Sequence, residues 1–239
     1  MTPPFSESWF YAPLEPGGHS QPFPAEEAHH ALHVLRLQPG REIVVSDGQG
    51  RVWHCRLEGD REKPTVRILS PFAEPVPKPR LSLAIALLKG RDCEEPIAAA
   101  CELPLADVHL LITDHCQVFN GQDHEKLLAR LRQKSLAALK QARKPYLTAI
   151  HAPRRLDEWQ KSHPDLHLVL AHPGMDVLPE KPPQAFALLI GPEGGFSERE
   201  IQWLQSLPHG YRLDLGSTRL RAVHAPLIGL GKLMGLKWF

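Results

Sequence analysis

The first 72 positions show short runs of alternating apolar and polar residues separated by turn residues. Two such runs, residues 43–46 and 51–57, lie on either side of Asp47-Gly48-Gln49-Gly50. An Asp-Gly pair between alternating runs is a strong hairpin signal, because glycine accepts the positive φ that tight turns require. We therefore predict a β-hairpin here.

Two further segments fit the same small domain. Residues 66–69 have the composition of another strand, and the apolar positions between residues 25 and 37 have the spacing of one short helix that ends at Pro39-Gly40. A small β-barrel with one helix is the natural prediction for residues 1–72. The prolines that follow indicate a stiff linker over residues 73–79.

From residue 80 the pattern changes to long apolar runs that alternate with amphipathic stretches. Residues 81–88 are almost all apolar, as in a strand that is covered on both faces. Further strands are predicted at residues 108–113, 166–171, 186–190 and 211–215, and helices at residues 93–103, 125–143, 198–207 and 226–239. This alternation predicts an α/β domain with a mostly parallel sheet over residues 80–239.

The composition is that of an ordinary globular protein. Hydrophobic residues make up 42% of the 239 positions and charged residues 23%, which excludes wholesale disorder, a collagen-like chain and a coiled coil. The four cysteines show no paired spacing, and we find neither a signal peptide nor an apolar run of the ~18 residues that span a bilayer. We expect a soluble cytoplasmic protein without a membrane segment. We also expect no metal centre, because the i,i+4 pair His29 and His33 lacks a third ligand.

Charge is distributed unevenly, although the net charge is only +1. Residues 1–79 carry 8 basic and 10 acidic side chains, which leaves 20 basic and 17 acidic ones for residues 80–239. Residues 126–155 contain no acidic residue and nine basic ones, namely Lys126, Arg130, Arg132, Lys134, Lys140, Arg143, Lys144, Arg154 and Arg155. Such a segment suits a polyanion, but a solvated helix face would have the same composition.

The segment Gly191-Pro192-Glu193-Gly194-Gly195 follows a predicted strand and precedes a predicted helix. Ser197 and Glu200 have the spacing of a capping box, and Phe196 and Ile201 have that of a hydrophobic staple. Three glycines in one turn let the bare backbone approach a ligand, and ligands of open α/β sheets bind beyond the carboxyl ends of the strands. We favour a ligand loop over a purely structural turn.

Residues 213–221 form a second loop with unusual chemistry. Two arginines, Arg219 and Arg221, flank Leu220 shortly after the predicted strand end at Gly216. Guanidinium groups pair with phosphate and can stabilise a developing anion. The alternative is that both arginines are simply solvated.

Together these residues resemble a known family. Ile190 and the five residues that follow it, with Leu215-Gly216 and Leu220-Arg221, resemble the SPOUT class of S-adenosylmethionine-dependent RNA methyltransferases. Within that class the chain is similar to the bacterial 16S rRNA (uracil-N3)-methyltransferases. His33-Val34-Leu35-Arg36, Gly40 and the Asp-Gly-Gln-Gly turn resemble that family's N-terminal PUA-like barrel, and residues 139–147 resemble its Gln-centred helix end.

The resemblance implies a SPOUT domain, tied in a C-terminal trefoil knot, at residues 80–239, and a PUA-like RNA-binding barrel ahead of it. Three loops would hold the methyl donor, S-adenosylmethionine, through His172, Ile190, Gly191, Glu193, Gly194, Leu215, Gly216 and Leu220. The 16S rRNA of the small ribosomal subunit would be bound through Arg36, Lys140, Arg143 and Lys144. Members of the family are homodimers with the terminal helix in the interface, and Gly231 and Gly235 are compatible with close helix packing.

The second loop departs from the family's usual Gly-x-Arg-Ile-Leu-Arg-Thr-Glu-Thr-Ala pattern. Thr218 replaces the first arginine and Val223 replaces the acid, while Arg219 and His224 fall outside the pattern. We expect Arg221 to stabilise the anion that forms when uracil N3 loses its proton. His224 is a candidate to accept that proton, although it also suits a position beside the start of the terminal helix.

Three functions are compatible with these residues. The first, which we favour, is an active rRNA uridine methyltransferase. The second is a related SPOUT enzyme that acts on another RNA base, and the third is a protein that binds RNA or the donor without transferring methyl. The replacements at Thr218 and Val223 are the features that separate the first function from the other two.

Overall fold

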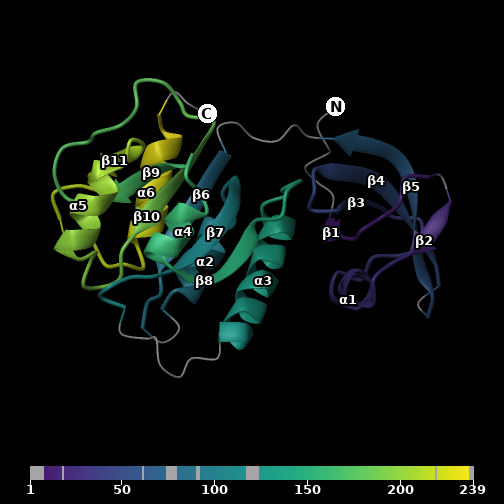
Figure 1. Ribbon diagram of the computed structural model, residues 1–239. Coiled ribbons are helices and arrows are strands. Elements are labelled where there is room, and N and C mark those ends of the chain that lie inside the picture. Colours follow the sequence, from purple (N-terminus) through teal and green to yellow (C-terminus); the bar gives the residue numbers. More distant parts are fainter. Residues whose placement is uncertain are drawn as a thin grey trace. The chain divides into compact units, whose positions relative to one another are not determined.

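The computed structural model describes residues 8–17, 19–60, 62–73, 80–89, 92–116, 124–218 and 220–236. Contacts divide the chain into two compact units, residues 1–76 with 139–147 and residues 77–138 with 148–239 (Figure 1). Most of the predicted linker, Arg219 and the last three residues of the predicted terminal helix lie outside the described residues. None of the described helices is long and apolar enough to cross a membrane.

The first unit is built on a five-stranded mixed sheet in the order β1-β3-β4-β5-β2. Its strands are β1 (Trp9–Tyr11), β2 (Ser20–Pro22), β3 (Glu42–Ser46), β4 (Arg51–Gly59) and β5 (Pro64–Ala73). The predicted hairpin is confirmed, because β3 and β4 pair antiparallel with Val45 opposite Trp53. Oδ1 of Asp47 accepts hydrogen bonds from the N–H groups of Gln49 and Arg51, which fixes the turn between them.

The helix of this unit is shorter than the sequence predicts. α1 (Ala25–His29) continues into a π-helical turn, η1 (His30–Val34), after which the N–H of Leu35 bonds to a carbonyl oxygen five residues back. Arg36 then adopts a left-handed conformation with φ 53°. A left-handed residue ends a helix by itself, so the helix stops before Pro39-Gly40 and not at it.

Residues 139–147 belong to the first unit although they are distant from it in the sequence. The N–H of Gly50 donates to the carbonyl oxygen of Pro145 at 2.9 Å, and the N–H of Leu147 donates to that of Gly48 at 2.8 Å. A Cβ on Gly50 would collide with the ring of Tyr146. The glycines of the hairpin turn therefore leave room for this segment to lie against it.

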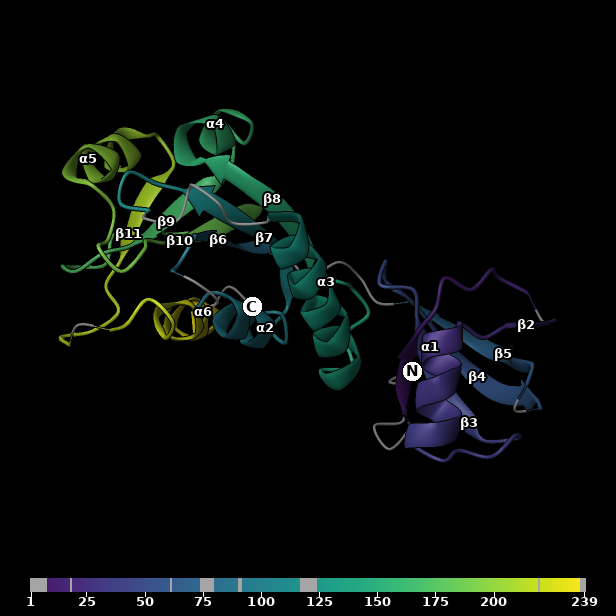
Figure 2. The same cartoon turned by 90° about the horizontal axis from the view of Figure 1, so that it is seen from below.

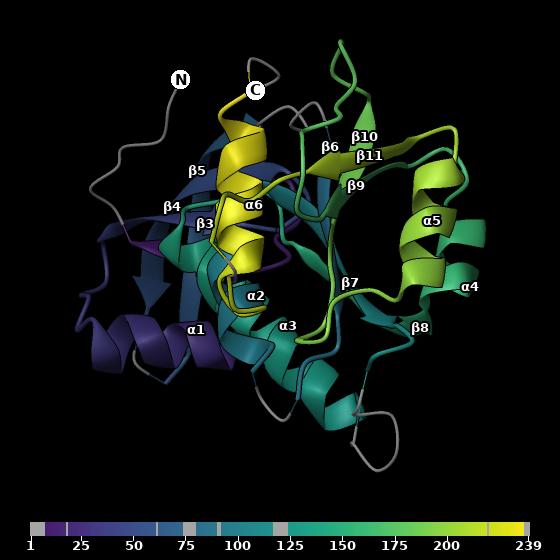
Figure 3. The same cartoon turned by 90° about the vertical axis from the view of Figure 1, so that its left-hand side faces the viewer.

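The second unit is a six-stranded sheet in the order β11-β9-β10-β6-β7-β8, and all its strand pairs are parallel, which confirms the predicted sheet. Its strands are β6 (Arg80–Ala86), β7 (Leu105–Ile112), β8 (Ala149–Arg155), β9 (His167–Ala171), β10 (Ala185–Ile190) and β11 (Gly210–Leu213). Its helices are α2 (Glu94–Ala100), α3 (His124–Gln141), whose last turn is counted with the first unit, α4 (Leu156–Lys161), α5 (Glu198–Ser206) and α6 (Ala225–Met234). α2 and α6 lie side by side on one face, whereas α4 and α5 cover the other (Figures 2 and 3).

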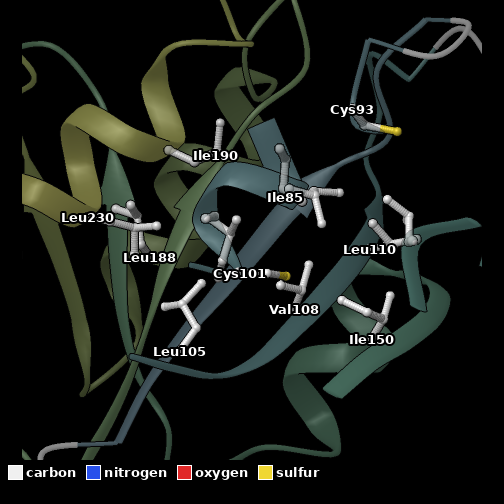
Figure 4. Close-up of a cluster of buried hydrophobic side chains, with 14 of the residues drawn as sticks. Ile85, Cys93, Cys101, Leu105, Val108, Leu110, Ile150, Leu188, Ile190 and Leu230 are labelled. Carbon is white, nitrogen blue, oxygen red and sulfur yellow. The ribbon is translucent and has the colours of Figure 1, made fainter. Parts of the chain in front are cut away.

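Both faces of the central strands are buried, which explains their continuous apolar runs. On the face of α2 and α6, Ile85 and Leu188 meet Leu230 in one cluster (Figure 4). On the opposite face, the alternate residue Ala84 packs in a second cluster with Trp159 of α4. The sheet therefore forms the middle layer of a three-layer unit.

An ion pair in the first unit leads to a stability prediction. Nζ of Lys140 lies 2.6 Å from Oε1 of Glu27, and the two side chains are 25% and 5% exposed. Replacing Lys140 with Met removes the cation and leaves the carboxylate of Glu27 buried. We expect the free energy of unfolding, measured by urea denaturation, to fall by about 2 kcal/mol.

The matched control is Arg132→Met, which removes a cation from an exposed position of the same helix. It should change the free energy of unfolding by less than about 0.5 kcal/mol. Adding Glu27→Gln to Lys140→Met should recover part of the loss, because the buried charge is then gone. Equal stabilities of Lys140→Met and Arg132→Met would show that the ion pair contributes nothing.

Candidate functional site

The carboxyl ends of β9, β10 and β11 open into one cavity of about 330 Å³. The end of β9, the β10–α5 loop and the β11–α6 loop form its walls, as expected where neighbouring parallel strands end at one edge of a sheet. The volume is at the lower end of that of small-molecule sites. The structure brings all eight residues expected at the donor to this cavity: His172, Ile190, Gly191, Glu193, Gly194, Leu215, Gly216 and Leu220.

The β10–α5 loop forms the central wall of the cavity. The N–H of Gly195, at φ 73°, donates to the carbonyl oxygen of Pro192 at 2.8 Å and closes a tight turn. A Cβ on Gly191 would lie 3.1 Å from the backbone nitrogen of Phe196. The glycines therefore allow the backbone to fold back on itself and to line the cavity without side chains.

The start of α5 is fixed by the predicted capping box, which is confirmed. Oγ of Ser197 accepts from the N–H of Glu200 at 3.2 Å, and Oε2 of Glu200 accepts from the N–H of Ser197 at 2.8 Å. Phe196 is buried on the preceding turn, and Ile201 packs against the same cluster. The loop therefore ends at a well-defined point.

Asp114, just beyond β7, adds to this cap. Its Oδ2 accepts from Oγ of Ser197 at 2.6 Å, and its N–H donates to Oε1 of Glu200 at 2.9 Å. Its carboxylate also pairs with Nη2 of Arg199 at 2.8 Å and 3.0 Å. The hydrogen bonds from Ser197 and Arg199 lower the pKa of Asp114, so the cap carries a stable negative charge.

The neighbouring His115 contacts the glycines of the loop directly. Its Nδ1 lies 3.1 Å from the carbonyl oxygen of Gly195, and its side chain lies beside Gly194. Sequence reasoning gave neither Asp114 nor His115 a role. The two residues come from the end of another strand, so nothing in the local pattern signals the contact.

The β11–α6 loop is held by a polar cluster. The N–H of Asp214 donates to Oδ1 of Asp176 at 2.8 Å, and Nζ of Lys232 donates to the carbonyl oxygen of Asp214 at 2.7 Å. Lys232 also pairs with Oδ2 of Asp176 at 2.8 Å. Burial acts to raise the pKa of Asp176, but the hydrogen bonds from Lys232 and Asp214 outweigh it and lower that pKa. The cluster ties α6 to the loop that lines the cavity.

A second cavity of about 400 Å³ adjoins the first, because Glu193, Leu220 and Ala222 line both. Arg221 lines this second cavity. Oε1 of Glu193 accepts from the backbone N–H of Lys89 at 3.2 Å, which holds the carboxylate between the two cavities. A cation and a carboxylate therefore lie next to the expected donor site.

Three other residues of the β11–α6 loop that the sequence analysis singled out lie in three different places. Thr218 lines the first cavity and Val223 the second, where Val223 also packs against the core. His224 lines neither of these cavities and stands exposed at the N-cap position of α6. Its position matches the alternative that sequence analysis left open, a residue at the start of the terminal helix.

The residues expected to bind RNA all lie in the first unit. Arg36 and Arg143 follow the ends of η1 and α3 with left-handed backbones, at φ 53° and 54°, where glycine is usual. The charge of Lys140 is largely neutralised by Glu27, so Lys140 is less available to a phosphate. The nine basic residues between positions 126 and 155 are divided between the two units, three in the first and six in the second.

Comparisons with known proteins identify the two units. A family model described as an RNA methyltransferase domain matches residues 75–234, and a model described as an RNA methyltransferase PUA domain matches residues 23–69. A protein from Synechocystis named ribosomal RNA small subunit methyltransferase E is 29% identical over 222 residues, which cover 88% of this chain and 71% of that protein.

Two solved structures share the fold. Ribosomal RNA small subunit methyltransferase E from Neisseria gonorrhoeae, bound to S-adenosyl methionine, gives a TM-score of 0.84 at 22% identity over 96% of this chain and 98% of that one. A methyltransferase from Legionella pneumophila in complex with SAM gives 0.81 at 28% identity over 95% and 97%.

These likenesses confirm the expected fold class, a SPOUT α/β domain preceded by a PUA-like barrel, while the trefoil knot stays a prediction. The RNA methyltransferase model matches well over half of the chain. The chain therefore belongs to the RNA methyltransferase domain family.

Proposed function

We propose that this protein transfers the methyl group of S-adenosylmethionine to N3 of a uridine in the 16S rRNA of the small ribosomal subunit. The observation that carries the proposal is the cavity beyond β9, β10 and β11, which is lined by all eight residues expected at the donor. The names of the Synechocystis and Neisseria relatives support the same donor and substrate class.

The residues around the cavity fit this donor. Ile190, Leu215 and Leu220 provide apolar surface suited to adenine, and a Cβ on Gly216 would meet nothing within 4 Å, so its backbone is open to a ligand. Glu193 supplies the carboxylate that would hold the donor's ribose or ammonium group. When bound, the donor supplies an electrophilic methyl group on a positively charged sulfur.

The adjoining cavity suits the acceptor base. N3 of uracil carries a proton between two carbonyl groups, and the loss of that proton spreads negative charge over the ring. Arg221 lines this cavity and offers a cation to the developing anion. His224, at the N-cap position of α6 and three residues after Arg221, is the proposed proton acceptor.

RNA binding is assigned to the first unit. We propose residues 1–72 as an RNA-binding barrel on which residues 139–147 pack, residues 73–79 as the linker and residues 80–239, apart from that segment, as the knotted methyltransferase domain. Arg36 and Arg143 would contact phosphates from their helix ends, with Lys144 beside them. We further propose that the protein works in the cytoplasm, where its substrate is assembled, as a homodimer that pairs through α6.

One observation favours a second candidate function. Thr218 lines the donor cavity where the family usually has an arginine, and Val223 lies in the acceptor cavity where it usually has an acid. A chain with these replacements could act on another base, or bind RNA and donor without transferring methyl. The following assay separates the three functions.

The first prediction is that small ribosomal subunits from cells without this modification accept labelled methyl groups from S-adenosylmethionine. Mass spectrometry of the digested RNA should identify the product as 3-methyluridine. Another methylated nucleoside would support a different target base. Calorimetric binding of the donor without any transfer to the subunits would support the binding-only function.

The second prediction concerns Arg221. Arg221→Ala should lower the rate of transfer by about 10²–10³-fold, as the loss of one anion-stabilising donor does, while the affinity for the donor stays within a few-fold. Single-turnover kinetics and calorimetry measure the two quantities. Lys161→Ala, which removes an exposed cation from α4, is the control and should retain full activity. Full activity of Arg221→Ala would remove Arg221 from the mechanism.

The third prediction concerns Asp114, which supports the capping box between the β10–α5 loop and α5. Asp114→Ala removes the partner of Ser197 and Arg199, so the loop that forms the cavity wall should lose its fixed position. We expect the donor's dissociation constant to rise about tenfold, which corresponds to about 1.4 kcal/mol. Asp165→Ala removes an exposed aspartate between α4 and β9 and should leave donor binding unchanged. If both variants bind the donor like the parent protein, the cap does not position the loop.

A further inference from the structure

A row of polar side chains crosses the sheet where apolar residues are expected. Ser82 of β6 lies opposite Asp107 of β7 in the strand register, and His109 of β7 lies opposite His151 of β8. Asp107 and His109 are two residues apart on one strand, so they share the face that α4 covers. Side chains between a parallel sheet and a helix are usually apolar, so this row requires a physical explanation.

Three of these residues present donor atoms to one point. One ligand atom from each of Asp107, His109 and His151 lies within 4.8 Å of the other two. The rings of the two histidines stack with centroids 4.4 Å apart, and Nε2 of His151 lies 2.9 Å from Oδ1 of Asp107. A tetrahedral ion with bonds of about 2.0–2.2 Å separates its ligand atoms by roughly 3.5 Å. Small side-chain rotations would therefore bring the three atoms to one ion.

The carboxylate of Asp107 is already oriented for this role. Its Oδ2 accepts from Nη2 of Arg80 at 2.8 Å and from Oγ of Ser82 at 3.4 Å, so Oδ1 is the oxygen directed at the histidines. Ligating carboxylates in metal sites are typically held by such hydrogen bonds. The ion pair with Arg80 also keeps this group in its carboxylate form.

His109 is the buried member of the group. It is 6% exposed, and its ring stacks on that of His151. One of its ring nitrogens is the ligand atom that it offers to the group. The ring centroids of Trp159, in α4, and His163, just after α4, lie 5.3 Å and 5.0 Å from that of His109. These two rings therefore cover His109 on the face of the sheet that α4 packs against.

We propose that Asp107, His109 and His151 form a binding site for a divalent transition-metal ion, most suitably Zn²⁺. Two imidazoles and one carboxylate are a donor set that Zn²⁺ accepts, with the fourth position open to water or to His163. The ion would clamp β7 to β8, the edge strand of the sheet. None of the three residues lines the cavities assigned to methyl transfer, so the site is separate from the proposed active site.

The test uses the full chain, stripped with a chelator and then titrated with Co²⁺, whose visible absorption reports its ligands. We expect one equivalent of Co²⁺ to bind and Zn²⁺ to displace it. Zn²⁺ should also raise the melting temperature of the protein. His151→Gln changes a side chain that is 46% exposed, so folding should be retained while the affinity falls by at least about 100-fold. His109→Phe keeps an aromatic ring in the stack and should abolish binding independently.

The chain offers a matched control. His167 and His209 also stack with centroids 4.4 Å apart, but no carboxylate joins them in a three-ligand group within the described residues. His209→Gln should therefore bind Co²⁺ like the parent chain. The proposal is overturned if the parent chain shows no saturable binding. It is equally overturned if His151→Gln and His109→Phe bind as tightly as His209→Gln.

Discussion

The parallel pairing of β9, β10 and β11 is the constraint on which the candidate site depends. Leu188 of β10 lies opposite Val169 of β9, and Leu213 of β11 lies opposite Ala171, so three chain segments leave the sheet at one edge. Beyond the strand ends the backbone groups lose their ladder partners and need others. Turns, the capping box of Ser197 and Glu200 and the carboxylate of Asp176 supply them, and the backbone left between these anchors forms the cavity wall.

The sequence predicted those elements whose burial leaves a periodic signal. β10 is buried on both faces, so its apolar run was clear, and the central hairpin was marked by its Asp-Gly turn. β8 was missed because it is an edge strand in which only Ile150 is buried and Pro153 interrupts the pattern. β1 and β2 have three residues each, which is too short for an alternation to be recognised.

The candidate site divides in the same way. The glycine loop and its capping box are local features, so the residues from Gly191 to Glu200 could be read directly, and the resemblance placed the other two loops. The bond between Asp114 and Ser197 joins residues 83 positions apart, and the pair of Lys140 and Glu27 joins residues 113 apart. Helix and strand periodicities relate residues only a few positions apart, so they cannot predict contacts over such sequence separations. The resemblance and the local charge assigned Lys140 to RNA, whereas the fold uses its ammonium group to neutralise a buried carboxylate.

α6 connects the donor cavity to an exposed surface. A Cβ on Gly229 would lie 2.7 Å from Cδ2 of Leu188, so this glycine, and not Gly231, lets the helix pack closely on β10. Lys232 holds the β11–α6 loop from the same helix, while Leu227 is 39% exposed on its outer side. A second copy of the chain that packs on the outer side of α6 would contact the same helix that holds the β11–α6 loop at the donor cavity. Pairing through α6 and donor binding would then change each other's free energy, because each acts on the position of the same rigid element.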